Sequence, residues 1–208
     1  MFTRQSHLDH YGAYDLPVVN VTAECCCGDF VALAKARGWP PFALLLYGIA
    51  RASLGVEPFR YRLAEGEAQR VERLMVGYTV IGVGGNLNFS SFPFDDDWTV
   101  FLDRYLADRV TARSALTLRA APLASRDYIF VTCLPWLRFT SIQHPIANLA
   151  DTSIPSIAVG RFDLAEGKVT FPMSVQAHHG LVDGLHIYQL FARVAAEMTS
   201  LVVEMNHE

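Results

Sequence analysis

The sequence predicts an α+β protein in which helices pack on one mixed β-sheet as a two-layer sandwich. Short apolar runs bounded by turn residues predict strands, and apolar residues at i, i+3, i+4 and i+7 predict helices between and after them. No repeat, low-complexity tract or linker divides the 208 residues. This length can bury a substantial core, so we expect one domain over residues 1–208.

The first two expected helices lie near one another in the N-terminal part of the chain. Residues 29–37 are expected to be helical because Asp29 can cap their start. Residues 41–54 follow, since Pro41 suits a first helical turn and Gly55 suits a stop. Apolar residues on one face predict that the second helix is part of the core: Phe42, Leu45, Leu46 and Ile49.

Strands are expected next at residues 59–63 and 73–82, and glycines 82, 84 and 85 predict a turn or bulge. A helix should follow to Arg113, opened by Asp95–Asp97 because carboxylates favour a helix N-terminus. We interpret these aspartates as a helix start and not as a metal site. The apolar face of this helix would be Trp98, Phe101, Leu102, Tyr105, Leu106 and Val110.

The second half of the chain contains three firm strand patterns, at residues 128–134, 156–162 and 169–177. Residues 163–168 read as a hairpin turn between the last two. Helical periodicity then returns over residues 185–198.

Charge and hydropathy exclude several classes of partner. A net charge of −4 provides no basic field for nucleic acid and no polybasic patch for a membrane. Hydrophobic residues make up 51% of the chain, which suggests surface buried between subunits. No apolar stretch is long enough to span a bilayer, and the N-terminus lacks the apolar core of a signal peptide, so we expect a cytoplasmic protein.

The four cysteines are the run Cys25-Cys26-Cys27 and Cys133. Their spacing matches no zinc signature. Adjacent residues on a strand point to opposite faces and do not readily form a disulfide with each other. We therefore interpret them as structural thiols and expect no metal site.

The most informative segment is Gln176-Ala-His-His-Gly-Leu-Val-Asp-Gly-Leu-His186. It places His178 and His179 where a strand should give way to a helix, with Asp183 about one helical turn further on. A histidine on such a turn can be held in one tautomer and act as a general base near neutral pH. Gly184 permits backbone conformations that other residues resist.

Several ordered motifs together resemble the chloramphenicol acetyltransferase family over nearly the whole chain. The pattern His-His-x-x-x-Asp-Gly at residues 178–184 is that family's signature. The other similar segments are His7-Leu-Asp-His-Tyr-Gly-Ala-Tyr14, Trp39-Pro-Pro-Phe42, Glu57-Pro-Phe-Arg60, Tyr78-Thr-Val80, Asn88-Phe-Ser90 and Cys133-Leu-Pro-Trp-Leu-Arg-Phe-Thr-Ser141.

The resemblance implies a homotrimer with active sites between subunits and acetyl-CoA as co-substrate, with no tightly bound cofactor. Acetyl-CoA would enter from one side and a small-molecule alcohol, chloramphenicol first among them, from the other. His179 would be the general base, and the oxygen it activates would attack the thioester directly, without an acyl-enzyme. Asp183 would hold the site together.

The alignment also shows where this chain departs from the family. The oxyanion-stabilising serine is replaced by Thr132, whose hydroxyl can still donate. The arginine that pairs with the aspartate falls at His7, and a water-ordering threonine falls at Ala158. Tyr14 matches the acceptor-site tyrosine, and Trp136 belongs to the Pro-Trp segment that we assign to substrate binding.

Other interpretations remain open at this point. The catalytic cores of 2-oxo-acid dehydrogenase complexes and peptide-synthetase condensation domains share the histidine signature, but neither a lipoyl-type domain nor twice this length is present. The acceptor could be another antibiotic or a metabolite alcohol. A non-catalytic small-molecule-binding protein is the alternative from a different class.

Overall fold

The computed structural model describes residues 2–119, 126–148 and 152–206, and its centre is one mixed sheet. The strands run in the order β1-β9-β7-β6-β4-β5, with β8 paired to β9. β6 lies parallel to both β4 and β7, and the other pairs are antiparallel. The strands are β1 (Val18–Gly28), β4 (Met75–Ile81), β5 (Leu87–Pro93), β6 (Tyr128–Cys133), β7 (Ser156–Val159), β8 (Asp163–Ala165) and β9 (Lys168–His178). A separate hairpin contains β2 (Tyr61–Ala64) and β3 (Glu67–Arg70).

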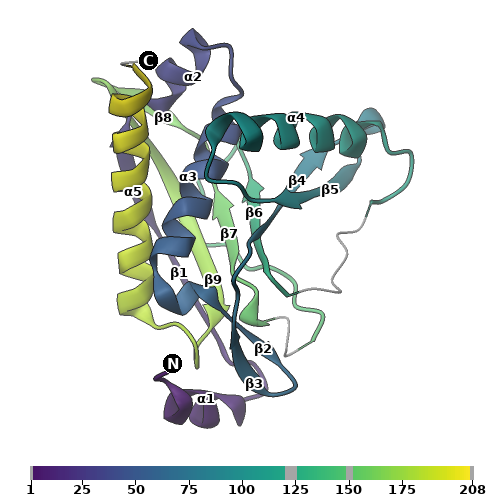
Figure 1. Ribbon diagram of the computed structural model, residues 1–208, viewed down its shortest axis with the longest axis vertical. Helices are drawn as coiled ribbons and strands as arrows, with labels where there is room; N and C mark the ends of the chain where they lie inside the picture. The colour runs from purple at the N-terminus through teal and green to yellow at the C-terminus, as the bar shows by residue number, and fades with distance from the viewer. Residues whose placement is uncertain (1, 120–125, 149–151, 207–208) are drawn as a thin grey trace.

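Helices cover one face of the sheet, which confirms the two-layer prediction (Figure 1). α3 (Pro41–Gly55) and α5 (Gly184–Asn206) run along the sheet, α2 (Phe30–Ala36) lies at one end, and α4 (Trp98–Ser114) crosses β4 and β5. The short α1 (Gln5–Gly12) lies at the opposite end from α2, near the β2–β3 hairpin.

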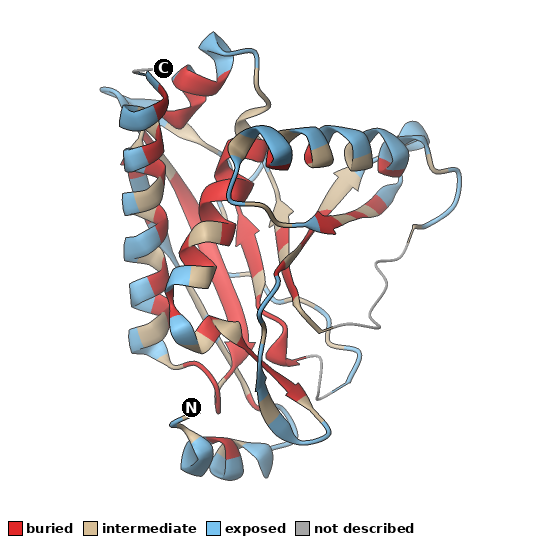
Figure 2. Cartoon of the chain, in the orientation of Figure 1, coloured by how far each residue is buried: buried red, intermediate tan, exposed pale blue. Residues whose placement is uncertain are grey.

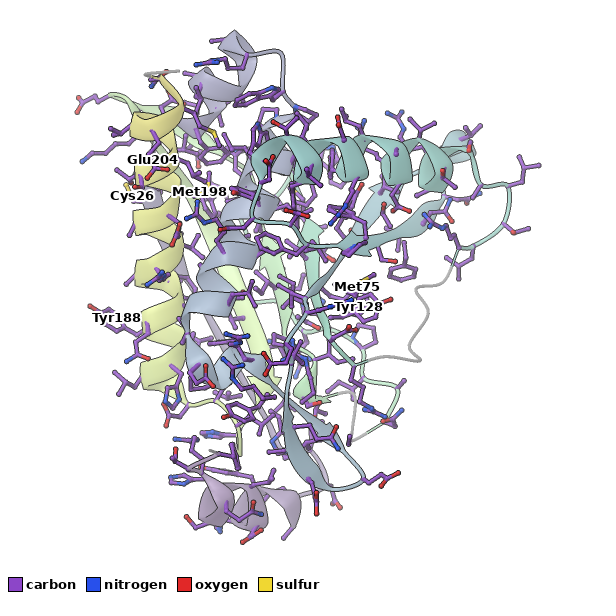
Figure 3. All side chains as sticks on the ribbon, in the orientation of Figure 1. Cys26, Met75, Tyr128, Tyr188, Met198 and Glu204 are labelled. Atoms are coloured by element: carbon purple, nitrogen blue, oxygen red, sulfur yellow. The ribbon has the colours of Figure 1, made fainter. Side chains whose placement is uncertain are left out.

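The core fills the space between these helices and the sheet (Figure 2). α3 is buried on almost every side, because it lies between α5 and the neighbouring helices and strands. Met198 on α5 points toward α3, whereas Tyr188 on the same helix points away from the protein (Figure 3). α5 thus has one buried stripe and one exposed stripe.

The opposite face of the sheet carries most of the polar strand residues. Side chains alternate along a strand, and Ile129, Val131, Ile157 and Val159 all belong to the core. Their neighbours on the other face are Phe130, Thr132, Ser156 and Ala158, and the same alternation on β9 adds Ser174, Gln176 and His178.

The predicted elements are present, with altered ends. Asp29 caps α2, and Asp97, the last of the three predicted aspartates, caps α4, each by accepting backbone N–H bonds. The expected strand at 59–63 begins only at Tyr61, because residues 57–60 form a 3-10 turn. The strand expected at 156–162 stops at Val159, and the segment treated as a hairpin turn contains β8.

Further differences concern helix faces and elements that were not predicted. Leu106 and Val110 of α4 were expected in the core but are 40% and 69% exposed. No ranges were predicted for α1, β1, β3 and β5, and the family-like segment Asn88-Phe-Ser90 lies in β5.

Gly160 provides a test of how tightly the end of β7 is packed. A Cβ at this position would lie 2.6 Å from the carbonyl oxygen of Leu137 and 2.5 Å from Cγ of Pro172. Because backbone and proline cannot move aside cheaply, we expect Gly160→Ala to lower the free energy of unfolding by about 1–3 kcal/mol, measured by urea denaturation. Gly12→Ala is the matched control, since nothing lies within 4 Å of its Cβ. Equal unfolding midpoints for the two variants would contradict this packing.

Candidate active site

His179 lies directly after β9, on the turn that leads into α5. Its backbone N–H donates to the carbonyl of Pro17 at 2.8 Å, which ties the end of β9 to the chain just before β1. Its Nδ1 lies 3.2 Å from the carbonyl oxygen of Val182. Since a carbonyl can only accept, Nδ1 carries the proton and Nε2 keeps its lone pair. The imidazole is therefore held in the tautomer that a general base needs.

A tyrosine from α1 fixes the plane of this imidazole. The ring of Tyr11 stacks on His179, with centroids 4.0 Å apart and planes inclined by 15°. The side chain of His179 is only half-buried, so the stack and the contact to Val182 leave part of the ring accessible. Together they limit rotation of the imidazole about its side-chain bonds.

Asp183 holds the turn from the other side. Its Oδ1 accepts from the backbone N–H groups of Leu185 and His186 at 3.0 and 3.3 Å, which caps the start of α5. Its Oδ2 accepts from Nη1 of Arg4 at 2.9 Å, and Nε of Arg4 lies 3.4 Å from the carbonyl oxygen of Gly180. Asp183 is thus committed to structure on both oxygens.

The electrostatics of Asp183 agree with this role. Partial burial alone would raise the pKa of its carboxyl group. The backbone bond from His186 and the neighbouring positive charges of His186 and Arg4 outweigh that effect, so the pKa lies below its ordinary value. The carboxylate is ionised at neutral pH and does not act as a proton acceptor there.

His178 has a different environment from His179, as strand alternation predicts. It is 2% exposed, and burial, helped by the adjacent His179, lowers its pKa to about 4. Its Nδ1 accepts from the backbone N–H of Gly180 at 3.0 Å. Gly180 is needed here because a Cβ would lie 2.9 Å from Cα of Leu8, where α1 crosses the turn. His178 is a neutral structural histidine.

The structure corrects the predicted ion pair of Asp183. The sequence alignment gave this pairing to His7, but the guanidinium of Arg4 makes it, and His7 is exposed on α1. Arg4 lies one helical turn before His7, and from there its longer side chain reaches Asp183.

The aromatic residue beside His179 also lies one helical turn earlier in the chain than the residue that the sequence predicted. Tyr11, one turn before Tyr14, stacks on His179, whereas Tyr14 is 50% exposed and contacts His10 through its hydroxyl at 3.3 Å. Arg4 and Tyr11 are seven residues apart, as His7 and Tyr14 are. That repeated spacing was the signal that could have revealed the alternative register.

Thr132 and Ala158 lie side by side on neighbouring strands, but away from His179 in the same chain. Thr132 on β6 pairs with Ala158 on β7, and Ala158 pairs with Ser174 on β9. His179 follows Ser174 by five residues, which at 3.4 Å per residue is ~17 Å along the strand. One chain alone therefore does not bring Thr132 to His179.

A cavity of about 530 Å³ opens beside the end of β6, on the face of the sheet that carries the helices. Its lining is mainly apolar and includes five aromatic residues, together with Cys133, Arg109 and Arg113. Trp136 lines it and is 65% exposed. The other aromatic residues are Phe42, Tyr78, Tyr105 and Phe162.

All four cysteines are free thiols, and three of them are shielded. Burial raises the pKa of Cys25 to about 12 and that of Cys133 to about 11, and it also raises that of Cys27. Such thiols are poor nucleophiles at neutral pH. Among the described residues no group of three or more His, Cys, Asp or Glu side chains is placed to hold a metal ion. Within that same part of the chain, every helix is too short or too polar to cross a membrane.

Comparison with known proteins identifies relatives of the whole arrangement. The family model for chloramphenicol acetyltransferase matches residues 1–195. A chloramphenicol acetyltransferase from Bacillus pumilus is 26% identical over 190 residues, covering 90% of this chain and 86% of the relative. Chloramphenicol acetyltransferase 3 from Escherichia coli is 27% identical over 199 residues, covering 93% and 91%.

Solved structures show the same fold. A chloramphenicol acetyltransferase superposes with a TM-score of 0.82 at 23% identity, over 95% of this chain and 96% of that one. A dihydrolipoamide acetyltransferase from Azotobacter vinelandii gives 0.67 at 16% identity, over 96% and 88%. With the family model matching almost the full length, the chain belongs to the chloramphenicol acetyltransferase family, as the sequence motifs predicted, and is a CoA-dependent acyltransferase.

Proposed function

We propose that this protein transfers an acetyl group from acetyl-CoA to a hydroxyl group of a small molecule, with chloramphenicol as the first candidate acceptor. The observation that carries the proposal is His179, whose Nδ1 is committed to the carbonyl of Val182 so that Nε2 is free to take a proton. Residues 1–208 would act as one domain. The four free thiols favour a reducing compartment, and we place the protein in the cytoplasm.

The proposed reaction is a direct displacement in a ternary complex. Nε2 of His179 removes the proton of the acceptor hydroxyl as its oxygen attacks the thioester carbonyl carbon. A carbon–oxygen bond forms, and collapse of the tetrahedral intermediate breaks the carbon–sulfur bond. The proton on His179 then neutralises the departing CoA thiolate. Holding both reactants in one site supplies much of the acceleration.

Thr132 is the candidate donor to the oxyanion of that intermediate. It is half-buried at the end of β6, on the sheet face opposite the helices, and its hydroxyl can donate one hydrogen bond. Its added methyl group restricts the angles from which an oxygen can approach.

We propose that His179 of one subunit and Thr132 of a neighbour form the active site of a homotrimer. The ~17 Å between them along one sheet supports this, since a base and an oxyanion donor for the same carbonyl must lie within a few Å of it. The high apolar content, 51%, is consistent with surface buried between subunits.

The cavity beside Cys133 is the proposed donor site. An acyl-CoA has a long, largely apolar arm with amide groups and an anionic nucleotide end. The aromatic walls and the guanidinium groups of Arg109 and Arg113 match those two parts. Trp136 would cover the arm near the strand end.

The residues assigned to acceptor binding favour a second candidate substrate, an antibiotic or metabolite alcohol other than chloramphenicol. Ala158 is fully buried and has no hydroxyl with which to order water. Tyr14, still our candidate for acceptor binding, packs against His10 and Tyr11 and not on His179 itself. A binding-only protein is the remaining alternative; retention of a free Nε2 on His179 argues against it.

His179→Ala tests the assignment of the base. We expect kcat to fall by about 10³-fold, because general-base catalysis contributes factors of this order. CoA-thiol release from acetyl-CoA is measured with chloramphenicol, other alcohols and amines. CoA binding and the thermal unfolding midpoint serve as controls for an intact fold. Release by the variant at the wild-type rate would exclude His179 as the base, and release by neither protein with any acceptor would favour the binding-only alternative.

Complementation between two inactive variants tests the interfacial site. Thr132→Val alone should lower kcat by about 10²-fold or more. When His179→Ala and Thr132→Val chains are refolded together, some interfaces combine an intact His179 with a partner's intact Thr132. Random mixing in a trimer should restore about a quarter of the wild-type activity. A mixture no more active than the separate variants, or a monomeric mass in solution, would refute this arrangement.

Replacing Arg4 tests the ion pair with Asp183 that holds the turn between β9 and α5. Arg4→Met should cost about 1.5 kcal/mol of stability, the scale of a hydrogen bond to a charged group. Because Arg4 helps to lower the pKa of Asp183, its loss raises that pKa. The carboxylate is then protonated at a higher pH, so the acid limb of the kcat profile and the loss of stability on acidification both move to higher pH.

His7→Ala is the matched control for Arg4→Met, since it removes the side chain that the sequence alignment had assigned to this pair. We expect its pH profile and unfolding midpoint to match those of the wild type. The Arg4–Asp183 ion pair would be the wrong assignment if His7→Ala shifted the acid limb of the kcat profile and Arg4→Met did not.

A further inference from the structure

Tyr105 is a buried tyrosine whose hydroxyl group has no hydrogen-bond partner among the residues that the structure describes. The residue lies on α4 and is 2% exposed, and it nevertheless lines the cavity beside Cys133. No hydrogen bond reaches its hydroxyl from any other described residue. Buried tyrosine hydroxyl groups are nearly always hydrogen-bonded, so a partner from outside the protein is expected.

The neighbouring Tyr78 shows what distinguishes Tyr105. The two rings stack, with centroids 5.2 Å apart and planes inclined by 21°. The hydroxyl of Tyr78 is fully shielded and has no hydrogen-bond partner, although Ser90 of β5 is near enough to lower its pKa, whereas that of Tyr105 is not among the atoms that are both shielded and without a partner. Only the Tyr105 hydroxyl therefore opens to the cavity.

The protonation state makes Tyr105 a donor. Burial raises the pKa of its phenol to about 12, against the smaller opposing effect of the guanidinium groups of Arg109 and Arg113. The hydroxyl keeps its proton at neutral pH and can donate it to an acceptor atom. Cys133, which follows Thr132 in β6, is also close enough to affect this phenol. Tyr105 and Cys133 line the same cavity.

We propose that the hydroxyl of Tyr105 donates a hydrogen bond to a carbonyl oxygen in the pantetheine arm of the acyl donor. This assignment rests on the proposed acyl-CoA function and adds a residue that binds the donor. The arm contains only amide and thioester carbonyls as strong acceptors, and the aromatic walls suit the methylene groups between them. The bond is present in the bound donor before and during reaction, so it contributes to binding rather than to the chemical step.

Tyr105→Phe removes only the hydroxyl and tests the proposal. Titration calorimetry with CoA should show binding about three- to ten-fold weaker than in the wild type, the loss expected for one neutral hydrogen bond. Binding of adenosine 3′,5′-bisphosphate, which lacks the pantetheine arm, should not change. In turnover, KM for acetyl-CoA should rise by the same factor while kcat at saturation stays constant.

Tyr188→Phe is the matched control, because it also removes only a hydroxyl, but from an exposed residue of α5 that does not line the cavity. Its affinity for CoA should equal that of the wild type. The Tyr105→Phe variant should unfold at the wild-type temperature or above, since it loses no protein partner.

Three results would overturn the assignment: unchanged CoA affinity in Tyr105→Phe, an equal loss for adenosine 3′,5′-bisphosphate, or a lowered unfolding midpoint with unchanged KM. Wild-type protein that does not bind CoA at all would instead refute the proposed donor and function. The two failures are therefore distinguishable.

Discussion

The ion pair between Arg4 and Asp183 joins the N-terminal segment to the turn before α5, and the geometry around His179 depends on it. The turn between β9 and α5 contains only four residues after His179, too few to hold an imidazole by themselves. Asp183 caps α5 with one oxygen and binds Arg4 with the other. Through this contact α1 is fastened across the turn, which brings Tyr11 onto the face of His179.

The sheet provides the second constraint. β9 is buried along almost its whole length, so the position of His179 relative to the core is fixed by strand register. The same register places Thr132 and Ala158 opposite Ser174, several residues before the turn. A rigid sheet cannot bend to close that gap. Under the proposed function, a site that uses both His179 and Thr132 would therefore need the sheets of two subunits.

The sequence contained enough local information for the helices with clear caps, for most sheet strands and for the contrast between His178 and His179. It did not determine where α1 docks. Arg4 and His7 lie about one helical turn apart, and either side chain could face the connection between β9 and α5. Only tertiary packing decides, and Leu8 against Gly180 fixes the helix at that place. Tyr105 shows the same limit of local information. Helical spacing placed it on the apolar face of its helix. Only the structure shows that it lines a cavity and that its hydroxyl has no hydrogen-bond partner among the described residues.

The contacts to Asp183 and His179 come from residues one helical turn earlier than the sequence predicted. This separates the support of His179 from Tyr14, the residue assigned to acceptor binding. Arg4 and Tyr11 keep the spacing needed to clamp the turn and stack on the base, so that function depends on helix geometry and not on a fixed sequence position. Tyr14 is thereby carried beyond α1 into the exposed connection toward β1. His179 and the residues that hold it can therefore stay in place while the residues around Tyr14 change. Ala158 is fully buried and offers no hydroxyl at its position, so the acyl transfer of the family is better supported than any single acceptor.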